Sequence, residues 1–128
     1  MSGVLVDTNI LIDYLRDRPQ AVKYVETGLG NMSISALTAA ELHAGARDDA
    51  ERQNLRDFTA AFNVIPADAA ICEMGGDFRA KYAPSHDIDL IDGLIAATSV
   101  LLDIPLVTLN KKHFPMLENV VLPYRRRS

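Results

Sequence analysis

The stretch GVLVDTNILIDYL, residues 3–15, contains the pattern that decides the fold. Its first residues are apolar and rich in β-branched side chains up to the acid Asp7, which is typical of a strand buried on both faces. Thr8 is a good N-cap for the segment that follows. Apolar residues there recur with helical spacing until the breaker at Arg18 and Pro19. We therefore expect a buried strand, an acid and a helix, in that order.

The same alternation continues along the chain. Further strands are expected at 32–35, 62–65, 106–109 and 120–123, the last at an edge of the sheet because of Pro123. Helices are expected at 20–29, 38–46, 49–62, from a cap at Asp68 to about 83, and from about 87–89 to 102. Strands that alternate with helices imply a largely parallel sheet covered on both faces.

Composition indicates a single globular domain, residues 1–128, with a cytoplasmic location. No apolar run approaches the roughly 20 residues that span a bilayer, so neither a membrane anchor nor a signal peptide is expected. Cys72 is the only cysteine, which excludes an internal disulfide, and we expect it to be buried as a small apolar residue.

Charge is unevenly distributed. The net charge of −4 argues against a non-specific nucleic-acid coat protein but allows a nucleic-acid substrate held by a local patch. Lys111 and Lys112 form one basic pair, and Arg125–Arg127 form another group near the end. Residues 124–128 are expected to be a flexible, solvated tail. The alternative is an arm that contacts phosphate or a partner.

Acidic and polar side chains fall where several expected strands end. Asp7 ends the first strand, Glu41 lies one turn into the helix after the second, and residues 110–113 follow the strand at 106–109. Because ligands bind outside the carboxyl ends of parallel strands, these groups are expected at one functional edge. Asp92 reaches the same edge if its strongly apolar helix has its N-terminus there.

Two of these acids also have a purely structural interpretation. Thr38 and Glu41 have the spacing of a capping box, in which Glu41 would only satisfy the start of a helix. Asp89 and Asp92 stand at the start of another helix, where Asp89 is the expected N-cap. The sequence pattern leaves both interpretations open.

Three carboxylates at one edge need compensation. Two carboxylates about 4 Å apart repel by roughly 4 kcal/mol at an effective dielectric of 20, against a domain stability of about 5–15 kcal/mol. A shared proton would offset part of this repulsion. A hard divalent cation would offset more, because Mg²⁺ and Mn²⁺ prefer oxygen ligands. Such a centre activates water and stabilises the charge of a phosphoryl transition state.

Motifs in a fixed order cover nearly the whole chain: VLVDTNILIDYL from Val4, TAAELHAG from Thr38, IDGLIAAT from Ile91 and VTLNKKHF from Val107. This set resembles a PIN domain of the VapC type, the toxin half of a VapBC toxin–antitoxin pair. The resemblance implies a three-layer α/β/α sandwich with a mostly parallel sheet and an Mg²⁺- or Mn²⁺-dependent endoribonuclease activity. It also implies a homodimer and neutralisation by a cognate VapB-type antitoxin.

By position in these motifs, the catalytic and metal-binding acids would be Asp7, Glu41 and Asp92. The chain departs from the family at the fourth acid. The family usually has an aspartate where Asn110 or, more often, His113 stands here. Asn110 can ligate through its carbonyl or hold a metal-bound water. His113 is a candidate ligand or phosphate contact, although His suits Mg²⁺ poorly.

Other residues are expected to support the site, and they are Thr8, Asn9, Asp89 and Thr108. Thr8 and Asn9 stand next to Asp7 and could orient its carboxylate, while Asp89 is either only a cap or a helper. Lys111 and Lys112 are candidates for binding RNA phosphates.

The missing fourth acid keeps one alternative function open, a PIN-like module that binds but has weakened catalysis. A receiver-like or phosphatase-like Mg²⁺ domain is a weaker alternative, because the segment Asp7-Thr8-Asn9 supplies no second acid.

Overall fold

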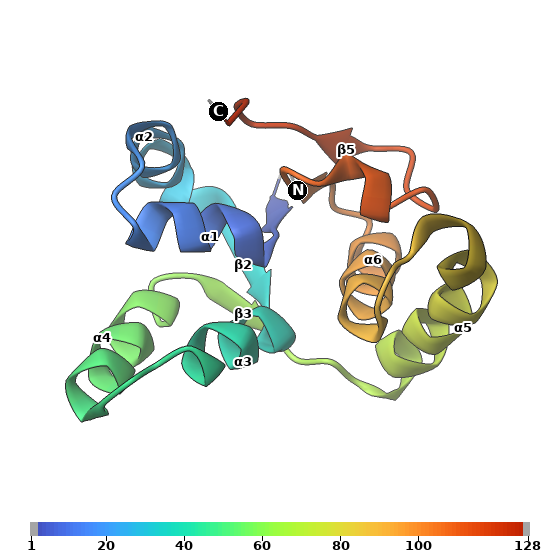
Figure 1. Ribbon diagram of the computed structural model, residues 1–128, viewed down its shortest axis with the longest axis horizontal. Coiled ribbons are helices and arrows are strands. Elements are labelled where there is room, and N and C mark those ends of the chain that lie inside the picture. The colour runs from blue at the N-terminus through green and yellow to red at the C-terminus, as the bar shows by residue number, and fades with distance from the viewer. Residues whose placement is uncertain (1–2, 127–128) are drawn as a thin grey trace.

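The computed structural model describes residues 3–126, and these form one parallel sheet covered by helices (Figure 1). Its strands are β1 (Val4–Val6), β2 (Met32–Ser35), β3 (Asn63–Ile65), β4 (Leu106–Val107) and β5 (Val120–Val121). The strand order is β3-β2-β1-β4-β5, and every neighbouring pair is parallel. All described strands therefore end at the same edge of the sheet, and β5 lies at one side as predicted.

Helices lie on both faces of the sheet. They are α1 (Thr8–Leu15), α2 (Pro19–Gly28), α3 (Ala36–Ala44), α4 (Asp49–Thr59), α5 (Ala69–His86) and α6 (Leu90–Leu102), with 3₁₀ turns η1 (Leu29–Asn31) and η2 (Lys111–His113). Figure 1 shows α1 to α4 on one side of the sheet and α5 and α6 on the other. The predicted three-layer α/β/α sandwich is confirmed. None of the helices in residues 3–126 is long and apolar enough to cross a membrane.

The central strand β1 shows why the first stretch is continuously apolar. Leu5 packs with Ile95 of α6 on one face, and Val6 packs with Ile10 and Leu11 of α1 on the other. Both strand residues are almost completely buried. Because successive side chains of a strand point to opposite faces, a strand between two helical layers must be apolar at every position.

Two helix starts differ from the sequence prediction. The N-cap of α1 is Asp7 rather than Thr8, because the Asp7 carboxylate accepts a hydrogen bond from the Thr8 N–H. Helix α3 begins at Ala36, where the Ser35 hydroxyl caps it by accepting from the Leu37 N–H. The predicted capping box of Thr38 and Glu41 is therefore wrong, since both residues lie inside the helix. Glu41 loses its structural explanation.

Two surface predictions also change. Cys72 is exposed rather than buried, because Ile71 and Gly75 form the buried stripe of α5 and Cys72 lies beside it. The flexible-tail prediction does not hold for Tyr124 and Arg126, whose side chains are hydrogen-bonded to Asp13. The end of that predicted tail, residues 127–128, lies outside the described residues.

Helices α5 and α6 approach closely through two glycines. A Cβ added to Gly75 would lie 2.6 Å from Leu94 Cδ2 and 2.7 Å from Leu94 Cα. A Cβ added to Gly93 would collide with the carbonyl oxygen of Gly75. Because Gly93 follows Asp92 directly, this contact also determines where the Asp92 carboxylate lies.

Replacing Gly93 with alanine is expected to lower the free energy of unfolding by about 1–3 kcal/mol, since the added methyl overpacks the contact between α5 and α6. Gly76→Ala is the matched control, because a Cβ there meets nothing within 4 Å. That control should gain up to about 1 kcal/mol from helix propensity. Urea unfolding followed by circular dichroism measures both changes. Equal stability of the Gly93→Ala variant and the parent would refute the close contact.

Candidate active site

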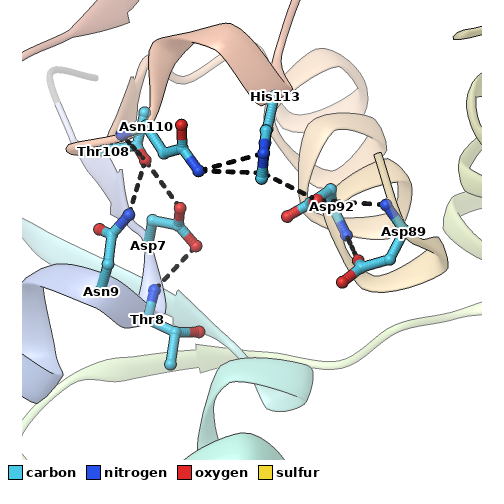
Figure 2. Close-up of polar contacts among 8 residues, drawn as sticks. All are labelled: Asp7, Thr8, Asn9, Asp89, Asp92, Thr108, Asn110 and His113. Atoms are coloured by element: carbon cyan, nitrogen blue, oxygen red, sulfur yellow. Dashed lines mark hydrogen bonds and ion pairs between the residues drawn. The ribbon is translucent and has the colours of Figure 1, made fainter. Parts of the chain in front are cut away.

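Asp7 is the buried acid at the centre of the carboxyl edge, with 7% of its surface exposed. Its Oδ1 accepts from the Thr8 N–H at 2.8 Å, and its Oδ2 accepts from the Thr108 hydroxyl at 2.7 Å (Figure 2). Burial raises the pKa of Asp7, the two hydrogen bonds oppose this rise, and the charge of Glu41 adds to it. Two hydrogen bonds thus fix the position of the carboxylate, while burial and the charge of Glu41 make its charged form less favourable.

Thr108 joins three segments of the chain at Asp7. Its buried hydroxyl donates to Asp7, and it accepts from Asn9 Nδ2 at 3.2 Å and from the Asn110 N–H at 3.1 Å. A threonine hydroxyl has one donor and two acceptor positions, so all of its capacity is used. The structure therefore brings together three of the predicted supporting residues, Asn9, Thr108 and Asn110.

Glu41 reaches the site through Thr8. The Thr8 hydroxyl donates to Glu41 Oε1 at 2.6 Å and lies 3.1 Å from the Thr38 hydroxyl. Thr8 follows Asp7 in the chain, so α1 and α3 present these two acids side by side. Unlike Asp7, Glu41 is exposed to solvent.

Asp92 and Asp89 form a reciprocal capping box at the start of α6. Asp89 is the N-cap, as predicted, and its Oδ1 accepts from the Asp92 N–H at 2.9 Å. The Asp89 N–H donates in return to Asp92 Oδ2 at 3.3 Å. Asp92 is therefore a helix-start residue by geometry, yet it also faces the site.

Electrostatics separate Asp92 from an ordinary cap. Burial, together with the charges of Asp89 and Asp7, raises the pKa of Asp92 to about 6. The hydrogen bond from the Asp89 N–H and the charge of His113 act in the opposite direction. Burial contributes most to this rise, and the charge of Asp7 contributes least.

His113 and Asn110 lie along the space between Asp7 and Asp92 (Figure 2). His113 Nδ1 is 3.3 Å from Asp92 Oδ2 and 3.0 Å from Asn110 Nδ2. A neutral imidazole nitrogen can accept from the amide, and a protonated one can donate to the carboxylate. His113 thus connects the Asn110 side chain to the Asp92 carboxylate. Lys111 and Lys112 lie beside it and are exposed.

The acids do not form a finished metal site. Within residues 3–126, no group of three or more His, Cys, Asp or Glu side chains is placed so that it could hold a metal ion. The donor set nevertheless fits a hard divalent ion, because Asp7, Glu41 and Asp92 offer only oxygen ligands. A carboxylate has about four acceptor positions, and the hydrogen bonds at Asp7 use only part of them. Burial, with a smaller contribution from neighbouring acids, raises the pKa values of Asp7 and Asp92, and a bound cation would favour their charged forms.

Fold and site together define a PIN domain. The family model described as PIN domain matches residues 4–117, and the chain belongs to this family. The chain is 40% identical over 124 residues to ribonuclease VapC10 of Mycobacterium tuberculosis, covering 94% of this chain and 92% of the relative. It is 36% identical to ribonuclease VapC19 of the same organism, covering 94% and 98% of the two chains.

Comparison with a solved structure supports the same family assignment. One chain of a toxin–antitoxin complex from Klebsiella pneumoniae superimposes with a TM-score of 0.83 at 32% identity, covering 97% of this chain and 100% of that one. The resemblance to VapC-type PIN domains is confirmed. The receiver-like or phosphatase-like alternative is excluded.

The role of one buried acid in α1 was not predicted from the sequence. Asp13 of α1 is 1% exposed and binds residues near the C-terminus. The available signal was its position, since an acid interrupts the apolar face of α1 between Leu11 and Tyr14. Two of its partners, Tyr124 and Arg126, lie more than 100 residues away in the chain, and local spacing does not reveal them.

Asp92→Asn is expected to stabilise the folded protein at neutral pH. The pKa of Asp92 is about 6 in the fold, against its usual 3.8. The stability contributed by its bound proton is therefore complete below about pH 4 and is lost as the pH rises through 6. At about 1.4 kcal/mol for each pH unit, this loss approaches roughly 3 kcal/mol by pH 7.

Urea unfolding at several pH values between 4 and 7.5 tests this expectation. The variant should be more stable than the parent by about 1–3 kcal/mol at pH 7, and the difference should shrink toward pH 4. The asparagine carbonyl can still accept from the Asp89 N–H, so the cap is retained. Asp77→Asn, an exposed acid of α5, controls for net charge. A pH-independent difference would contradict the raised pKa.

Proposed function

We propose that this chain is a divalent-metal-dependent endoribonuclease toxin that acts on cytoplasmic RNA and is neutralised by a cognate VapB-type antitoxin. The observation that carries the proposal is the arrangement of acids at the carboxyl edge of a PIN fold, where Thr8 and Thr108 hold the Asp7 carboxylate and the Thr8 hydroxyl holds Glu41 beside it. The ribonuclease names of its relatives VapC10 and VapC19 support the same activity.

PIN-domain ribonucleases generally depend on divalent metal ions. In this chain Asp7, Glu41 and Asp92 would hold Mg²⁺ or Mn²⁺, with Asn110 and His113 beside them. When bound, the ion would supply activation of a water molecule and stabilisation of the charge on the phosphoryl group.

The protein's own residues orient these acids. The Thr8 N–H and the Thr108 hydroxyl hold the two oxygens of Asp7, and the Thr8 hydroxyl holds one oxygen of Glu41. Asp89 fixes the backbone at Asp92 through the capping box. Such preorganisation places ligand oxygens before substrate arrives and reduces the reorganisation that the reaction requires.

Basic residues next to the acids suit a polyanionic substrate. Lys111 and Lys112 are exposed in η2, between Asn110 and His113. Their ammonium groups would bind phosphates that flank the cleaved bond, and such contacts weaken as salt concentration rises. Such a local patch would allow a chain with a net charge of −4 to bind RNA.

Assembly follows from the same family relationship. The Klebsiella pneumoniae neighbour is a toxin–antitoxin complex, and other structural neighbours are VapBC complexes. We infer that this chain binds a VapB-type antitoxin and forms a homodimer.

Asp7→Asn is expected to lower the rate of RNA cleavage at saturating Mg²⁺ by at least about 100-fold, since losing one charged ligand removes several kcal/mol of transition-state stabilisation. The fold should survive with a modest loss of stability, because the amide oxygen can still accept from the Thr8 N–H while the hydrogen bond from the Thr108 hydroxyl is lost. Cleavage of total cellular RNA by antitoxin-free protein, with and without chelator, gives the measurement. The control is Asp77→Asn on α5. An Asp7→Asn variant with full activity would refute the proposal.

The variant His113→Asp tests whether the histidine at this position weakens the binding of Mg²⁺ at the site. An acid beside Asp92 adds an oxygen ligand, so Mg²⁺ should bind at least several-fold more tightly, as measured by isothermal titration calorimetry. The metal-free variant should be less stable than the parent at pH 7, because the new charge repels Asp92. His86→Asp makes the same exchange at the exposed end of α5. Unchanged Mg²⁺ affinity would show that His113 does not stand in for the fourth acid. Absence of metal-stimulated cleavage in the parent would favour the binding-module alternative.

A further inference from the structure

The C-terminal segment, residues 122–126, is fastened to helix α1. The Tyr124 hydroxyl donates to Asp13 Oδ2 at 2.9 Å. Arg126 donates from Nε to Oδ2 and from Nη2 to Oδ1 of Asp13, each at 3.0 Å. In Figure 1 the chain after β5 runs back across the molecule to the side where α2 lies. A chain end is usually poorly ordered unless specific contacts hold it.

Asp13 is suited to this task because it is buried. Only 1% of its surface is exposed, and Arg18 lies 3.6 Å away as a further cation. A buried carboxylate is unfavourable unless it is paired and hydrogen-bonded. Burial raises the pKa of Asp13, but the hydrogen bonds from Arg126 and Tyr124 and the nearby positive charges outweigh it and lower the pKa overall. The acid therefore stays charged and keeps the segment in place.

The fastened segment forms one wall of a groove. This groove has a volume of about 480 Å³ and is lined by Asn9, Leu109, Asn110, Leu122, Tyr124, Arg125 and Arg126. Asn9 and Asn110 both donate to the Thr108 hydroxyl, which in turn donates to Asp7. The groove therefore begins next to the residues that hold the central acid.

The charges in the groove differ in availability. Arg126 is engaged by Asp13 in a two-point contact. Arg125 is exposed and lines the groove, and the exposed Lys111 and Lys112 follow the lining residue Asn110 in the sequence. The amide groups of Asn9 and Asn110 and the exposed cation of Arg125 thus line one groove, a combination that suits the bases and phosphates of an extended single strand.

We propose that this groove binds the single-stranded RNA that flanks the cleaved phosphate, with Arg125 contacting a backbone phosphate and Asp13 positioning the segment that carries it. The inference rests on the proposed ribonuclease function and adds the path of the substrate. Arg125 acts through its charge, and Asp13 acts only through the residues it holds.

The first test measures RNA binding in the Asp7→Asn protein, so that the probe is not cut. The probe is a fluorescent single-stranded RNA of mixed sequence and about 20 nucleotides, long enough to cover such a groove. Arg125→Ala should weaken binding several-fold at low salt and reduce the slope of log K against log salt by about 0.7. Arg79→Ala, at an exposed arginine of α5 on the other face of the sheet, should leave both values unchanged.

The second test separates positioning from net charge. Asp13→Asn removes a negative charge, so an effect of charge alone would tighten RNA binding. Loss of the fastening would instead weaken binding several-fold although every cation remains. If Asp13→Asn fails to fold, Tyr124→Phe removes one hydrogen bond to Asp13 and keeps the ring, with a smaller weakening expected.

Different failures have different meanings. If the parent binds the RNA and Arg125→Ala binds it with the same affinity and salt slope, the groove is not the RNA path. A variant impaired only in binding the antitoxin would overturn the inference in favour of a protein interface. If wild-type protein neither binds nor cleaves RNA, the proposed function itself fails.

Discussion

The hydrogen bond from the Thr108 hydroxyl to Asp7 is the interaction on which the rest of the site depends. The parallel register pairs Val6 with Val107, and the Asp7 N–H continues the ladder by donating to the Val107 carbonyl at 2.9 Å. The residues that follow both strands are thereby brought side by side. Because Thr108 also accepts from Asn9 and the Asn110 N–H, one buried hydroxyl fixes the acid, the start of α1 and the loop before His113 relative to one another.

Asp92 has a favourable effect at the start of α6 and an unfavourable one as a partly buried charge at the site. A carboxylate in the first turn of a helix is favourable, because it accepts from free N–H groups and faces the positive end of the helix dipole. Burial and neighbouring acids nevertheless raise its pKa to about 6. The close contact of Gly75 and Gly93 holds α6 against α5 and keeps Asp92 in this position. Packing elsewhere in the domain therefore maintains a charge that is unfavourable where it lies.

Much of this arrangement could be predicted because it follows from strand direction and local spacing. Asp7 and Glu41 could be assigned to one edge once the strands were taken as parallel, and Asp89 could be assigned as a cap from its place before an apolar helix. Local spacing failed where two signals competed. Ser35 and Thr38 are both capping residue types near the start of α3, and Ser35 is the cap because β2 ends there. The distances between the acidic side chains could not be predicted from the sequence either, because they depend on how α6 packs against the rest of the domain.

Helix α1 connects the catalytic edge with the C-terminal segment. Near its first turn Asn9 donates to Thr108 and accepts from the Leu109 N–H at 3.4 Å, while Asp13 further along accepts from Tyr124 and Arg126. Both contacts join the first residues of the chain to its last, across more than 90 intervening positions. Helix α1 therefore links Asp7 to the groove beside Arg125, through Asn9 in its first turn and Asp13 one turn further along.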